Sequence, residues 1–77
     1  MYTVEMATAF KELTPPENFG VTILDANDFL TIQIDPEDIE NLLDHQVNDA
    51  VKYINDVKNV LESHGAIVYI VREALKD

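Results

Sequence analysis

Most side chains in this sequence that could do chemistry are carboxylates. The 77 residues include fifteen Asp and Glu against five Lys and Arg, which gives a net charge of −10. From Glu17 to Val51 there are acids but no lysine or arginine, whereas protein surfaces usually mix both signs of charge. The candidate partner-binding residues of this segment are Asp25, Asp28, Asp35, Glu37, Asp38, Glu40, Asp44 and Asp49. We interpret them as one connected acidic patch, formed by a hairpin turn and the first half of a helix.

The spacing of three of these acids indicates what such a patch could imitate. On a helix, Glu37, Glu40 and Asp44 would climb one side at steps of roughly 4.5–6 Å. Phosphates advance along a DNA strand by a similar few ångströms. A row of carboxylates at this spacing could occupy a basic cleft that normally holds a nucleic-acid backbone.

The same residues also have a simpler explanation, which is a solvated acidic surface. Glu37 and Asp38 complement the dipole in the first turn of a helix, and aspartate is common in turns. This explanation does not account for the missing bases, because like charges at Glu40 and Asp44 mildly destabilise a helix. We therefore expect the sign of this surface to matter for function.

Nucleophilic catalysis and zinc binding are not supported by the spacing of the serine and the histidines. Ser63 is the only serine, and its neighbouring base is His64. Adjacent residues at a helix end are not expected to point at each other. His45 and His64 lack the close spacing of zinc ligands, and the absence of cysteine excludes thiolate sites and disulfides.

Calcium and phosphate sites are not supported either. The Asp25-Ala26-Asn27 sequence opens like a calcium loop, but Leu30 and Pro36 stand where such a loop needs glycine and a bidentate glutamate. Two glycines in the whole chain cannot form a glycine-rich phosphate loop. We expect a protein that is not an enzyme, with no catalytic residues, no cofactor and no metal.

The element that must position most of these acids is a helix predicted from Asp35 to Gly65. Asp35 suits the N-cap and Pro36 the first helical position, and Gly65 is a typical stop. If unbroken, these roughly 28 helical residues would span about 42 Å, against about 30 Å for a compact domain of this length. The helix must overhang the domain, break within the polar run His45 to Asp49, or pack on a second copy. Its apolar stripe comprises Ile39, Leu43, Val47, Ala50, Ile54, Val57 and Leu61.

Strands are predicted on both sides of this helix. Residues 1–10 alternate as in a strand, although Met6, Phe10 and Leu13 also fit helical spacing. Residues 21–24 and 29–34 form a hairpin with a four-residue turn at 25–28. Residues 66–71 are apolar on both faces and predict a central strand, whose second face would meet the N-terminal segment or a partner subunit. Residues 72–77 form a polar tail that could make a last helical turn.

These elements predict a single α+β domain over residues 1–77. It would contain a small sheet of three to four strands with one long amphipathic helix packed across it, in the order β-β-β-α-β. A chain of this size is marginally stable alone, so we expect a homodimer. No apolar run is long enough to span a membrane, and the N-terminus lacks the basic region of a signal peptide. We expect a soluble intracellular protein that binds neither nucleic acid directly nor a membrane, because its charge repels both.

The acid-only segment Glu17 to Asp49 and the acidic helix DPEDIENLLD (35–44), in a small cysteine-free chain, resemble the DNA-mimic proteins of bacteriophages. Among these, the chain is most similar to phage inhibitors of the bacterial histone-like protein HU. The resemblance implies a dimer that fills the DNA-binding cleft of an HU-like dimer and displaces DNA, in the cytoplasm and nucleoid of the infected host. Lys52 and Lys58 depart from a purely acidic face and confine the mimic surface to the hairpin and the first half of the helix.

Two other functions remain open from the sequence. One is an adaptor that recognises its partner through apolar contact, which an exposed patch around residues 66–71 or along the helix stripe would favour. The other is a phage inhibitor of a different host machine, such as RNA polymerase or a restriction enzyme.

Overall fold

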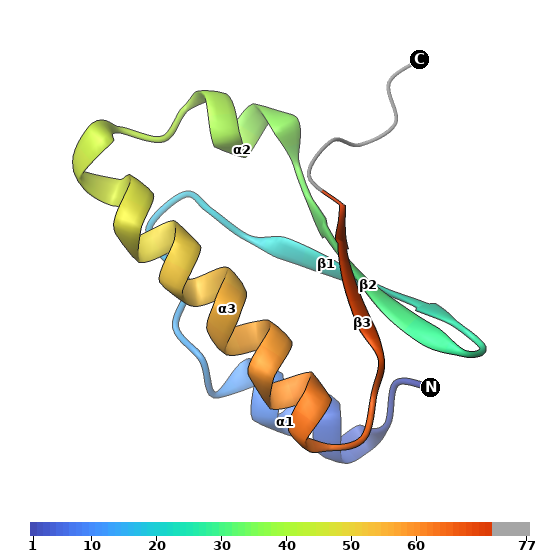
Figure 1. Ribbon diagram of the computed structural model, residues 1–77. Helices are drawn as coiled ribbons and strands as arrows, with labels where there is room; N and C mark the ends of the chain where they lie inside the picture. Colours follow the sequence, from blue (N-terminus) through green and yellow to red (C-terminus); the bar gives the residue numbers. More distant parts are fainter. Residues whose placement is uncertain (72–77) are drawn as a thin grey trace.

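The computed structural model describes residues 1–71 of the chain. A three-stranded sheet packs on one side against a long helix, a second helix packs against that long helix, and a third, very short helix stands at one end of the molecule (Figure 1). In chain order the elements are α1 (Val4–Lys11), β1 (Val21–Ala26), β2 (Phe29–Ile34), α2 (Pro36–Glu40), a 3-10 turn (Asp44–Gln46), α3 (Val47–Ser63) and β3 (Val68–Val71).

The first element is a helix, so the strand predicted for residues 1–10 is wrong. Thr3 caps α1, because its hydroxyl accepts a hydrogen bond from the amide of Met6 at 3.2 Å. Met6 is buried, and Phe10 and Leu13 pack against the core one and two turns further on. The helical spacing of these three residues therefore decides the structure, and the alternation along the same stretch does not.

The hairpin is confirmed, but its turn is tighter than predicted. β1 and β2 pair antiparallel from Val21 opposite Ile34 to Ala26 opposite Phe29. Only Asn27 and Asp28 connect the two strands, since Asp25 and Ala26 continue the pairing of β1.

The predicted helix from Asp35 to Gly65 is broken, and a break was one of the three alternatives that its length left open. The break lies at residues 41–43, just before the polar run in which it was expected, and that run begins as the 3-10 turn. Leu43 is extended, and its amide donates to Oε1 of Gln46 at 3.0 Å. The break lets α2 turn back over the end of the sheet, so the described residues measure only 33 Å along their longest axis.

The end of α3 and the strand after it are arranged much as predicted. Gly65 adopts a left-handed φ of 95°. The amides of Gly65 and Ala66 donate to the carbonyls of Glu62 and Leu61 at 2.9 and 3.2 Å, which is the hydrogen-bond pattern of a Schellman motif. β3 then pairs parallel to β2, with Leu30 opposite Val68.

The strand order is β1-β2-β3, so β2 is central and β3 lies at the edge. The prediction of a central strand at residues 66–71 is wrong, and only residues 68–71 are extended in the sheet. Apolar character on both faces of β3 reflects one buried face and one exposed face. The predicted polar tail at residues 72–77 lies outside the described residues.

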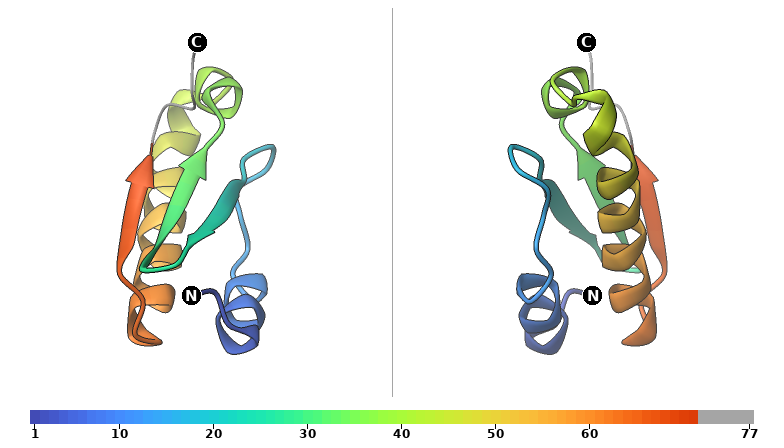
Figure 2. Two further views of the ribbon diagram at one scale, coloured as in Figure 1. Left: turned by 90° about the vertical axis from the view of Figure 1, so that its right-hand side faces the viewer. Right: turned by 90° about the vertical axis from the view of Figure 1, so that its left-hand side faces the viewer.

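The core lies between the sheet and its helices. Leu30, Ile32 and Ile34 point from β2 towards α3, whose Val57 and Leu61 are fully buried. Figure 2 shows α3 on one side of the sheet and, among residues 1–71, no helix over the other side. The predicted α+β fold class, a small sheet with a long helix packed across it, is confirmed, with three strands and a helix in place of the first strand. Among residues 1–71, no helix has the length and apolar character needed to cross a membrane.

Candidate interaction surfaces

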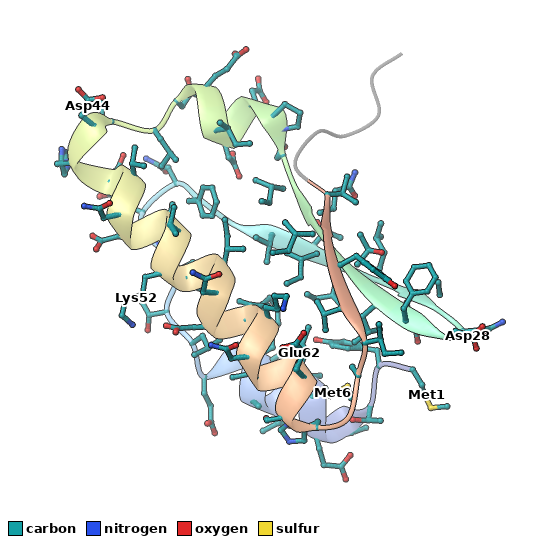
Figure 3. The ribbon with its side chains drawn as sticks, viewed as in Figure 1. Met1, Met6, Asp28, Asp44, Lys52 and Glu62 are labelled. Atoms are coloured by element: carbon teal, nitrogen blue, oxygen red, sulfur yellow. The ribbon has the colours of Figure 1, made fainter. Side chains whose placement is uncertain are left out.

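The candidate acids do not form one connected patch, because β2 separates them into two groups. Asp28 lies at the tip of the hairpin and Asp44 at the opposite end of the molecule (Figure 3). From Asp28 to Asp35 the chain runs along the whole of β2, a distance of about 23 Å for an extended strand. The expectation that the hairpin turn and the first half of the helix come together is therefore wrong.

One group of acids occupies the segment from Asp35 to Asp44, which we call the acidic arm. Asp35 caps α2, since its Oδ1 accepts from the amide of Glu37 at 2.9 Å. Glu37 and Glu40 are exposed on α2, and Asp44 is exposed at the start of the 3-10 turn. These three acids are close in sequence but do not climb one continuous helix, because the break at residues 41–43 lies between Glu40 and Asp44.

The remaining candidate acids lie outside the segment that forms the arm. Asp49 is exposed in the first turn of α3. Asp25 is exposed near the end of β1, where its carboxylate accepts from the amide of Tyr2 at 3.1 Å and lies 3.8 Å from the N-terminal ammonium group. Asp25 therefore holds the N-terminal segment against the hairpin and is an unsuitable phosphate mimic.

Two side-chain hydrogen bonds connect the acidic arm and the 3-10 turn after it to the loop before β1. The amide of Gly20 donates to Oδ2 of Asp38 at 3.3 Å, and Nε2 of Gln46 donates to the carbonyl of Glu17 at 3.4 Å. A polar groove of about 780 Å³ runs between residues 17–20 and the arm. Asp38 is half-buried in this position, so it positions the arm as well as contributing charge.

The ion pairs of the described residues leave the arm unneutralised. Lys52 pairs with Asp56 at 2.9 Å and Lys58 with Glu62 at 2.8 Å, each four residues apart on α3. Within residues 1–71 no cationic group lies within 4.0 Å of a carboxylate of the arm. The two lysines that interrupt the acidic face are thus already paired with acids of their own helix.

A second surface is the outer face of the sheet, which no helix of the described part of the chain covers. The left view of Figure 2 looks onto this face. The strand registers place Leu24, Phe29, Tyr69 and Val71 on it, together with threonine and glutamine but no charged residue. Phe29 and Tyr69 pack edge to face with ring centroids 5.2 Å apart, and Tyr69 is 56% exposed. This apolar outer face is unusual in a chain of which 26% is charged.

A third surface is an apolar groove between α2 and α3, which the sequence did not predict. Phe19 and Ile34 form its floor, and Ile39, Val47 and Val51 form its walls. The periodicity placed Ile39 and Val47 in a core-facing stripe, yet they are 40% and 44% exposed. The break before α3 opens the groove, and periodicity alone contains no signal for a break.

The expectation that Ser63 and His64 point apart is wrong, since Ser63 Oγ lies 3.5 Å from His64 Nδ1. Both groups, however, bond the carbonyl of Val60, the hydroxyl at 2.7 Å and the ring nitrogen at 2.9 Å. Nδ1 must carry a proton to donate to that carbonyl. In this arrangement it cannot accept the hydroxyl proton, and both side chains cap the exposed end of α3.

Searches of protein families, curated proteins and solved structures identified no protein similar to this chain.

Proposed function

We propose that this protein is a non-enzymatic binding protein that presents its acidic arm to the DNA-binding surface of a basic protein and displaces DNA. An HU-like dimer is the first partner to test, because the acid-only segment resembles that of phage DNA mimics. In this proposal the carboxylates of Glu37, Glu40 and Asp44 take the place of phosphates, and Asp35 and Asp38 shape the arm that carries them.

The observation that carries this proposal is the unneutralised charge of the arm. Its exposed acids have no cationic partner among the described residues, although Lys52 and Lys58 both form ion pairs elsewhere. A concentration of charge of one sign speeds the association of partners of the opposite sign and disfavours partners of the same sign. The two acids of the hairpin, Asp25 and Asp28, are left out of the binding surface because they are too distant.

Competition for DNA tests the proposal directly. The protein is titrated into a complex of HU with fluorescently labelled DNA, and release of DNA is followed by anisotropy at low and at high salt. We expect release at low salt and much weaker release at high salt, because exposed charge pairs are screened. If DNA stays bound at every salt concentration, HU is not the partner.

A matched pair of variants separates the arm from net charge. Glu37→Gln, Glu40→Gln and Asp44→Asn together remove three charges from the arm, and we expect competition to weaken by about tenfold or more. The control removes three charges elsewhere, on α1 and at the hairpin tip, by Glu5→Gln, Glu12→Gln and Asp28→Asn. Equal losses in the two variants would show that only total charge matters.

The uncovered outer face supports homodimerisation as part of this proposal. Three strands about 4.8 Å apart, two of six residues and one of four, give a footprint of at most roughly 14 by 20 Å, well below the about 800 Å² that each partner buries in a standard interface. Pairing of a second copy along the free edge of β3 would add area and main-chain hydrogen bonds. Tyr69→Lys should then convert a dimer into a monomer in sedimentation velocity.

The same outer face favours a second candidate function, an adaptor that binds its partner through apolar contact. The discriminating measurement is binding to proteins of a bacterial lysate at two ionic strengths. A partner retained at high salt and lost with Tyr69→Lys supports the adaptor. A basic partner that is lost at high salt and with the triple arm variant supports the DNA mimic.

A further inference from the structure

The groove between α2 and α3 is small and apolar, so charge pairing with the acidic arm gives it no role. Its volume is about 240 Å³, below the roughly 300–1,000 Å³ of pockets that hold drug-sized ligands. Single anchoring side chains fit such a volume better than a whole small molecule does. Ile39 and Val51, on opposite walls, are 40% and 52% exposed, so the groove is open to a partner.

The walls of the groove also restrict the secondary structure of that partner. α2 and α3 are helices whose backbone groups are already bonded internally, so they cannot accept an added strand. An amphipathic helix needs only side-chain contacts, and it places apolar residues three and four positions apart on one face. Val47, Val51 and Ile54 follow this same spacing along α3, over about two helical turns.

Charge around the groove determines the polar face of the partner. Glu37 and Glu40 are exposed on the helix that forms one wall, and neither pairs with a cation among residues 1–71. A helix with lysine or arginine beside its apolar stripe would meet these acids, whereas an acidic helix would be repelled.

We infer that the α2–α3 groove docks a basic amphipathic helix of the partner, with apolar anchors against Ile39, Val47 and Val51 and basic residues against the acidic arm. This inference rests on the proposed basic partner and adds that recognition includes an apolar helix site. It predicts a binding component that survives raised salt, which charge pairing alone does not provide.

Three synthetic peptides of roughly 15 residues test the inference on the unmodified protein. The first consists of leucine and lysine with leucines at helical i, i+3, i+4 spacing, the second is its scrambled form, and the third replaces lysine with glutamate. The first should bind and shift the methyl NMR signals of Ile39, Val47 and Val51, with the other two at least about tenfold weaker. Equal binding of the scrambled peptide, or shifts at Tyr69 instead of the groove, would overturn the inference.

A variant and its control complete the test. Val51→Gln should weaken the leucine–lysine peptide by about tenfold, while Val4→Gln, at an exposed valine on α1 outside the groove, should leave its affinity unchanged. The amide spectrum of each variant checks that the fold is retained. If Val51→Gln leaves the affinity for the peptide unchanged, the inference that the groove docks a helix is contradicted.

The outcome is separable from that of the proposed function. DNA release that depends on the arm but not on Val51 would support the DNA mimic and reject the groove. Peptide binding in the groove without any displacement of DNA would retain the groove and reject the DNA mimic.

Discussion

The amide of Gly20 donates a hydrogen bond to Oδ2 of Asp38 over 3.3 Å, and this contact ties the loop before β1 to the acidic arm. The two residues belong to segments that only the fold brings together. Asp38 therefore has a structural role that its position in a run of acids did not indicate. Substitutions can separate that role from its charge.

Asp38→Asn should largely preserve partner binding, while Asp38→Ala should weaken it. Asparagine retains an oxygen that can accept from the Gly20 amide, whereas alanine leaves that part-buried donor without its partner, at a cost of about 1–3 kcal/mol. Competition for HU-bound DNA, with urea unfolding of each variant, measures both effects. A loss of binding as large in the asparagine variant as in the alanine variant would show that Asp38 acts through its charge.

Gln46→Ala should loosen the connection between α2 and α3. The substitution removes the acceptor for the Leu43 amide at 3.0 Å and the donor to the Glu17 carbonyl at 3.4 Å. We expect faster amide hydrogen exchange at Leu43, with little change at Val57 in the buried part of α3. Gln46→Glu keeps the acceptor alone and should protect Leu43 nearly as well as glutamine does; exchange as fast as in the alanine variant would rule out this cap.

Leu61→Ala should destabilise the protein by about 2–5 kcal/mol, the usual loss when a large apolar side chain is deleted from a core. Leu61 is fully buried, whereas Leu43 is 58% exposed. The same substitution at Leu43 should therefore cost much less, within about 0.5 kcal/mol. Urea denaturation monitored by circular dichroism compares the two, and similar midpoints would contradict the observed packing of α3 on the sheet.

Stability should fall when the solution becomes strongly alkaline. Burial raises the pKa of Tyr53 above its ordinary value, because the phenolate is poorly solvated where the ring packs against Phe19. A raised pKa in the folded state gives stability that is complete below about pH 10 and is lost as pH rises through the folded pKa. The thermal midpoint of the unmodified protein should therefore drop as the pH rises above about 10.

Tyr53→Phe is the variant that isolates this effect, since it removes the titrating hydroxyl and keeps the ring. Its thermal midpoint should fall less over the same pH range. Burial also raises the pKa of Tyr2, so Tyr2→Phe serves as the comparison. If both variants lose stability exactly as the unmodified protein does, other groups cause the alkaline loss.

The sequence predicted those elements whose signals are local and strong. The two short strand segments predicted at residues 21–24 and 29–34 are the hairpin of β1 and β2, and Gly65 marked the end of α3. A helix break was among the alternatives but was expected a few residues later, within His45 to Asp49. Apolar periodicity does not locate the break at residues 41–43, because it contains no signal for side-chain hydrogen bonds such as the one from the Leu43 amide to Gln46.

The candidate surfaces were predicted less well than the fold. Counting charges identified the acids but not their positions in space. Those positions depend on the length and direction of β2, which places Asp28 far from the arm. Two exposed walls of the α2–α3 groove were expected to be core residues, since Ile39 and Val47 belong to the apolar stripe of the predicted helix. The outer face was indicated in part, because Tyr69 belongs to a stretch that is apolar on both sides.

The parallel pairing of β2 with β3 also fixes the order in which the molecule can assemble. β1 and β2 are neighbours in the chain and can meet early, whereas Val68 cannot reach Leu30 until α3 has been synthesised between them. Contacts between such distant residues slow folding because a long loop must close first. During that interval the unpaired edge of β2 and the apolar side chains of α3 are accessible to other chains. Nascent copies that are synthesised close together on one messenger RNA are therefore at risk of associating before each has completed its own sheet.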